Sequence, residues 1–230
     1  MPISVVDSTA GGSAALVTSI TTNVPAGTQA NDVLIWAVYG NIATAMGTPS
    51  GWNVWHQQTG TAQQWSIYWK YALATEAASY TATVASSRWS YSMVAFRGAH
   101  LTTPEGTASA GTAGTTAMAF PAITPTVAGS WVLAFGGVIS ASGVVTTTFS
   151  STNLDAYVVN GATHGMTSTQ GNAVNCAGSV AYEQWTAGAF TPAMTFTPTP
   201  STRTMGVSSV LVADATVAAP GRVRRMSRRR

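Results

Sequence analysis

The sequence predicts an all-β protein, a jelly-roll or lectin-like β-sandwich built from two similar halves. Thr, Val, Ser and Gly are abundant in the chain, and turn residues recur about every 8–12 positions, as is typical of sandwiches and barrels. Helix signals are scarce. The best helical candidate, residues 71–78, is short and runs directly into a strand-like segment, so we predict a strand end followed by a turn. The third observation is an internal echo between the two halves.

The echo is seen in the order of the predicted strands. Each half has a turn, Pro25-Ala-Gly27 in the first and Ala128-Gly129-Ser130 in the second, before an apolar run of strand length. Trp65, Ile67 and Trp69 alternate with Ser66 and Tyr68, which places the three large side chains on one face of a strand. The first half offers strands at residues 33–39, 51–55, 64–71, 79–84 and 89–96, and the second half offers counterparts at 131–135, 154–159, 178–185, 194–197 and 205–212.

We predict that residues 1–214 form one sandwich domain, with halves at about residues 20–100 and 120–214. Two four-stranded sheets packed face to face would bury one side of each. Neither half has an obvious polar face of its own to expose. The alternative is two tandem domains joined by residues 100–116, which are rich in Gly, Ala and Thr and are predicted to form a long crossover loop.

The composition indicates a folded protein with few charges. Only 7% of residues are charged, against a usual value of about 25%. Disorder is excluded for the body because 46% of residues are hydrophobic and aromatic residues are plentiful. A surface with so few charges suits a protein packed among neighbours, a secreted β protein or a protein that faces sugars.

Several classes are disfavoured by what the chain lacks. The start of the sequence has no basic region followed by an apolar stretch, so we expect no secretory signal. No run approaches the roughly 18 apolar residues of a membrane span, so we expect no membrane partner. Cys176 is the single cysteine; it excludes an intramolecular disulfide and is expected to be a small buried residue, since no neighbouring cation would activate a thiol. We expect synthesis in a cytoplasm.

The sequence shows no persuasive pattern of catalytic or metal-binding groups, which favours a protein that is not an enzyme and needs no cofactor. His56, His100 and His164 lack metal-ligand spacing and are expected in loops. A glycosidase needs two carboxyl groups about 5–10 Å apart. Glu183, within the predicted strand at 178–185, is the acid placed as a catalytic acid would be, and either Asp155 or Asp32 could partner it. Asp32, however, precedes a strand in a turn, where its side chain is expected to bond the backbone.

The tryptophans allow two interpretations. Six of the eight lie between Trp36 and Trp89, which favours a role in the core of the first half. The alternative is that Trp52 and Trp55, on the turn-like segment 51–56, are exposed and stack on a sugar ring.

Charge is concentrated in one short segment. Residues 1–221 contain four cations and seven acids, a net charge of −3, whereas residues 222–230 carry six arginines and bring the total to +3. Six arginines in nine residues repel one another, so we predict that residues 215–230 form a flexible basic tail. Arginine pairs well with carboxylates and phosphates. Binding to an acidic protein surface, binding to nucleic acid and a purely solubilising role remain open for Arg222, Arg224, Arg225, Arg228, Arg229 and Arg230.

Several motifs in the first half resemble a family of virion proteins of tailed bacteriophages. They are Gly27 with Asp32-Val-Leu-Ile-Trp-Ala37, Pro49-Ser-Gly-Trp52, Ile67-Tyr-Trp-Lys-Tyr-Ala72, Glu76-Ala-Ala-Ser-Tyr-Thr81 and Val94-Ala-Phe-Arg-Gly98. The resemblance covers about residues 20–100 well and 120–214 more loosely, and it does not include the arginine-rich segment.

The resemblance implies a lectin-like β-sandwich that works in a virion, as a minor capsid, decoration or tail-associated protein. Its implied partner is the major capsid protein or another virion protein. We therefore predict a capsid decoration protein made in the host cytoplasm and located in the virion. The alternative is a tail-associated or carbohydrate-binding module that contacts host glycans. A homo-oligomer is compatible with the uncharged surface, but the sequence selects no particular symmetry.

Overall fold

The computed structural model describes residues 2–13, 15–113, 117–140, 145–151, 153–154, 156–159, 162–163, 168–170, 175–197 and 201–213. The regular elements within these ranges are all β-strands, and the pairings between them are antiparallel, which confirms the predicted all-β class. Residues 72–78 are a turn region between two strands, also as predicted.

The first half forms a five-stranded sheet covered by a two-stranded ribbon. The sheet has the order β1-β7-β3-β5-β4, and the ribbon consists of β2 and β6. The seven strands are β1 (Ser4–Gly12), β2 (Val17–Asn23), β3 (Val33–Gly40), β4 (Asn53–Gly60), β5 (Gln63–Tyr71), β6 (Ser79–Ser87) and β7 (Trp89–Arg97).

The second half repeats this topology. Its main sheet has the order β8-β17-β10-β15-β12, with β13 added beyond β12, and β9 pairs with β16 in an outer sheet that also contains β11 and β14. The strands are β8 (Ala99–Ala113), β9 (Ala117–Met118), β10 (Trp131–Ser140), β11 (Val145–Ser151), β12 (Ala156–Val159), β13 (Ala162–Thr163), β14 (Ser168–Gln170), β15 (Asn175–Gln184), β16 (Met194–Thr197) and β17 (Ser201–Ala213). Each strand of the first half thus has a counterpart in the same place of the second, and the predicted echo is a repeat of the fold.

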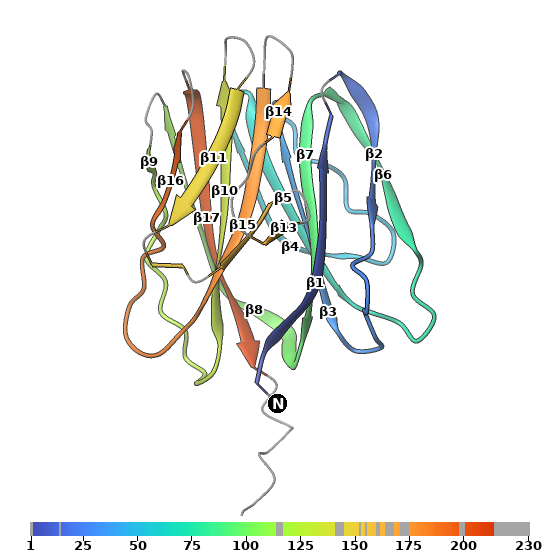
Figure 1. The fold of residues 1–230 in the computed structure, drawn as a ribbon, viewed down its shortest axis with the longest axis vertical. Coiled ribbons are helices and arrows are strands. Elements are labelled where there is room, and N and C mark those ends of the chain that lie inside the picture. The colour runs from blue at the N-terminus through green and yellow to red at the C-terminus, as the bar shows by residue number, and fades with distance from the viewer. Residues whose placement is uncertain are drawn as a thin grey trace, which may run out of the picture.

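The sheets stack in four layers, with the β2–β6 ribbon and the β9–β16 sheet outside and the two main sheets in the middle (Figure 1). This corrects the prediction of two sheets that each bury only one side. All eight residues of β3 are buried, because the run Val33-Leu-Ile-Trp-Ala-Val-Tyr39 presents apolar side chains at both odd and even positions. Odd positions face the other main sheet and even positions face the ribbon.

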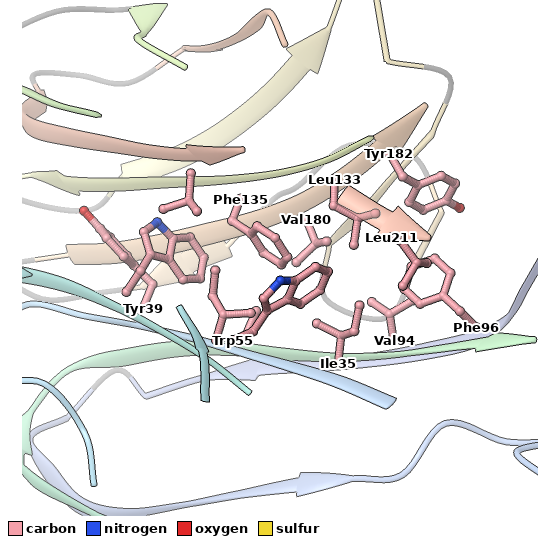
Figure 2. Close-up of a cluster of buried hydrophobic side chains, with 14 of the residues drawn as sticks. Ile35, Tyr39, Trp55, Val94, Phe96, Leu133, Phe135, Val180, Tyr182 and Leu211 are labelled. Carbon is pink, nitrogen blue, oxygen red and sulfur yellow. The ribbon is translucent and has the colours of Figure 1, made fainter. Parts of the chain in front are cut away.

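One buried cluster contains side chains from both halves. Ile35, Tyr39 and Trp55 from the first half meet Phe135 and Val180 from the second between the two main sheets (Figure 2). Hydrogen bonds also cross this layer. The indole nitrogen of Trp65 donates to the carbonyl of Met205 over 3.3 Å, and the amide of Gly178 donates to the hydroxyl of Ser90 over 3.0 Å.

The repeat is asymmetric in side-chain size where the main sheets meet. Tyr39 pairs with Trp65 in the first half, and at the corresponding places of the second half Gly137 pairs with Gly178. A Cβ atom at Gly137 would lie 2.4 Å from the Tyr39 ring, and one at Gly178 would lie 2.9 Å from the Trp65 ring. The glycines therefore make the space that the two aromatic rings fill.

Residues 100–116, predicted as a crossover loop, are mostly strand. Residues 99–113 form β8, which pairs along β17 with two register shifts. Its small residues resemble those of β1, its counterpart, which contains Ser-Thr-Ala-Gly-Gly at 8–12. Sequence reasoning missed β8 because Gly and Ala are depleted in strands, and here long-range pairing overrides that local preference.

Candidate functional site

The two tryptophans proposed as sugar platforms lie in the interior. Trp52 is 5% exposed and Trp55 is 6% exposed. Trp52 packs edge-on against Tyr80, with ring centroids 5.1 Å apart, and Trp55 packs against Phe135 between the main sheets (Figure 2). The glycan-stacking hypothesis is therefore wrong for both residues, because neither ring offers a face to a ligand. The Gly-Trp motif at 51–52 is a packing motif.

Next to Trp52 lies a nearly buried polar cluster. The Lys70 ammonium is 2.9 Å from Glu76 Oε1, and both side chains are only 9% exposed. Lys70 also donates to the Tyr80 hydroxyl over 2.5 Å, and Tyr80 donates to the Glu76 carboxylate. The other Glu76 oxygen accepts the backbone N–H of Leu73 over 2.6 Å. Glu76 thus ties the 72–78 turn to strands β5 and β6.

The ionisation of this cluster follows from its contacts. Burial alone would raise the pKa of Glu76, but hydrogen bonds from Tyr80, Lys70 and the Leu73 amide, together with the Lys70 charge, outweigh it and lower that pKa. Burial alone would lower the pKa of Lys70, but its hydrogen bonds and the charge of Glu76 outweigh it and raise that pKa. Both groups are therefore charged at neutral pH, and the cluster is a satisfied ion pair.

A second ion pair, Asp32–Arg97, joins two of the motifs that carry the resemblance. Arg97 donates through Nε and Nη2 to the two oxygens of Asp32, over 2.9 and 2.8 Å, and also to the carbonyl of Gly27. The backbone N–H of Gln29 donates to Asp32 Oδ2 over 2.7 Å, which confirms that Asp32 bonds the backbone of its own turn. The carboxylate of Asp32 is only 3% exposed. Its oxygens are thus engaged in holding the turn before β3 to the end of β7.

We expect the Asp32→Ala substitution to destabilise the protein by about 2 kcal/mol, because it removes three hydrogen bonds to a buried carboxylate. Arg97 has 34% of its side chain exposed, so it can recover hydration, and the loss stays moderate. Urea unfolding monitored by tryptophan fluorescence measures the effect. Asp7→Ala is the matched control, since Asp7 accepts one exposed backbone hydrogen bond, from Ala26. Equal destabilisation by both substitutions would contradict this account.

The remaining candidate reactive groups are dispersed. Cys176 is buried, as predicted, its thiol donates to the carbonyl of Tyr39, and burial raises its pKa. His56 lies in β4 and His100 in β8, which corrects the expectation that they are loop residues. Glu183 lies near the end of β15 and is half-buried. Asp155 and His164 lie outside the described residues.

Two further kinds of feature are absent from the described ranges. These ranges contain no group of three or more His, Cys, Asp or Glu side chains placed to hold a metal ion. They also contain no helix that is long and apolar enough to cross a membrane. The arginines predicted as an anchor, Arg222, Arg224, Arg225, Arg228, Arg229 and Arg230, lie outside the described residues, whose last strand ends at Ala213.

Comparison of the chain with protein-family models, with curated proteins and with solved structures found no match.

Proposed function

We propose that this chain is a structural virion protein of a tailed phage, a capsid decoration protein that acts by binding. The observation that carries the proposal is the separation of charge along the chain. Residues 1–221 have a net charge of −3, and six of the nine arginines lie within residues 222–230. A basic segment next to a charge-poor β body suits a module that docks on a negatively charged assembly.

The partner that fits this charge pattern best is an acidic capsid surface. Arginine binds carboxylates bidentately, so a short segment gains several charge-assisted hydrogen bonds. Many copies bound to one symmetric shell gain from avidity, so each single contact can be weak. The body then serves as the displayed module. Within that body, the ion pairs Asp32–Arg97 and Lys70–Glu76 hold turns and strands together.

The proposal is tested on purified particles of the phage whose genome encodes the chain. We expect mass spectrometry to find the protein in the particles and immunogold microscopy to place it on the head. Labelling confined to the tail would replace the decoration role with a tail-associated one. Absence from purified particles would overturn the virion proposal altogether.

Replacing the six arginines of residues 222–230 with glutamine is expected to abolish binding to particles that lack the protein, while the unfolding midpoint stays unchanged. Sedimentation of particles with added native or variant protein measures this. The matched control replaces Arg88 and Arg203 with glutamine and is expected to retain binding. These are the arginines outside residues 222–230 other than Arg97, which pairs with Asp32. The opposite result is that native protein does not bind particles but binds naked DNA, with a slope of log K against log salt of about −5. That result would show that the basic segment binds nucleic acid.

A further inference from the structure

The internal repeat exposes a difference between the two main sheets at one edge. In the second half, β12 is followed outward by β13, with Val158 paired to Thr163 and Val159 to Ala162. In the first half, β4 is the counterpart of β12 and ends the order β1-β7-β3-β5-β4. Over the ranges that the structure describes, no strand pairs with the outer edge of β4. The same fold therefore accepts a sixth strand at this place in one half and lacks it in the other.

The β4 edge has less of the usual protection against strand pairing than the other described edges, since its one such device is a bulge near its start. Natural edge strands are blunted by charge, proline, short length or bulges. Among the edge strands described for the two main sheets, β1 carries Asp7, β8 carries Pro104 and Glu105, and β13 has two residues. β4 has eight residues, Asn-Val-Trp-His-Gln-Gln-Thr-Gly, with neither charge nor proline.

The pairing segment of β4 can be placed more closely. A bulge lies between Val54 and His56, and from His56 to Gly60 the register with β5 is regular. Burial lowers the pKa of His56, so this ring is uncharged at neutral pH. Thr59 is exposed and Val54 is 43% exposed, one of few large apolar side chains on the described surface. The edge is thus neutral along its length, and within its regular part the side chains of Gln57 and Thr59 are exposed.

We propose that β4 pairs in antiparallel fashion with β4 of a second copy of this chain, which joins two five-stranded sheets across a twofold axis. In a twofold antiparallel contact the same short segment of both β4 strands meets, so like charges within that segment would oppose pairing, and β4 has none. The Gln57 amide donates to Met46 and Tyr68 of its own chain, so the proposed contact relies on backbone hydrogen bonds between the two β4 strands. The antiparallel direction is also that of the pairings within both main sheets.

The test is a charge-swap experiment at Thr59 in the full chain. Sedimentation equilibrium at protein concentrations up to about 100 µM is expected to show a dimer for the native protein, a range that covers weak specific contacts. Thr59→Lys and Thr59→Glu are each expected to weaken dimerisation at least about tenfold through like-charge repulsion. An equal mixture of the two variants is expected to restore a dimer.

The matched controls are Thr83→Lys and Thr83→Glu, which introduce the same charges at an exposed site on β6. They are expected to leave the dimer unchanged, and circular dichroism checks that every variant keeps the native strand content. A native protein that is monomeric at the highest concentration overturns the proposal. A dimer that persists in both Thr59 variants, or a mixture that stays monomeric, also overturns it. None of these results bears on whether the protein is found on virions.

Discussion

The Gly137→Ala substitution is expected to destabilise the protein by about 3 kcal/mol, at the upper end of what one added methyl group costs in a packed core. The new Cβ would lie 2.4 to 2.6 Å from three atoms of the Tyr39 ring. That ring cannot move away, because it is fully buried, packs on Trp65 with centroids 4.8 Å apart and donates a hydrogen bond to Gln63. The clash must therefore be relieved by separating the two main sheets.

Urea unfolding of the native protein and of the variant measures this loss. Gly47→Ala is the matched control, since a Cβ atom at Gly47 would meet no atom within 4 Å, and it is expected to be nearly neutral. A double-mutant cycle assigns the cause: in a Tyr39→Leu background, Gly137→Ala is expected to cost at least about 1 kcal/mol less than in the native background. Equal costs in both backgrounds would show that the Tyr39 ring is not what excludes the methyl group.

The Glu76→Ala substitution is expected to cost about 3–5 kcal/mol, because it leaves the nearly buried Lys70 ammonium without its countercharge. It also removes the acceptor for the Tyr80 hydroxyl and for the Leu73 amide. The double variant Lys70→Met with Glu76→Leu is expected to be more stable than Glu76→Ala, since it leaves no unpaired charge in the site. Thermal unfolding at pH 7 compares the three proteins.

The same cluster predicts how stability depends on pH. The pKa of Glu76 is lowered in the folded protein, so its contribution to stability is present above the pKa of the unfolded chain. It is lost as the pH falls through the lower folded pKa. The native protein should therefore lose more stability than Glu76→Gln between neutral and acidic pH. Parallel stability curves for the two proteins across that range would contradict the assignment.

The fold class and the repeat could be predicted from the sequence because they depend on local patterns. Residues 33–39 and 131–135 are apolar runs that follow turn residues at comparable places in the two halves, and both form central strands. β8 was missed because its Gly and Ala residues have little strand preference of their own. It is a strand only because β17 lies beside it and supplies hydrogen-bond partners.

The candidate sites could be predicted less well, because their character depends on burial. Trp52 follows a turn glycine, a place where a side chain is commonly exposed, but the packing of Trp36 and Tyr80 around it closes the site. Lys70 and Glu76 were the single lysine and one of seven acids in the sequence. Their pairing became visible only once β5, β6 and the turn between them were placed together.

The sequence is sufficient to identify a charge-poor β protein with a repeated order of strands and a basic segment at residues 222–230. These properties follow from composition and from periodicity along the chain, which need no knowledge of distant neighbours. Three properties became visible only in the folded protein: the main sheets are buried on both faces, Tyr39 and Trp65 fill the space left by Gly137 and Gly178, and β4 ends its sheet. Each of these depends on contacts between segments far apart in the chain, where shape and burial, and not local preference, set the outcome.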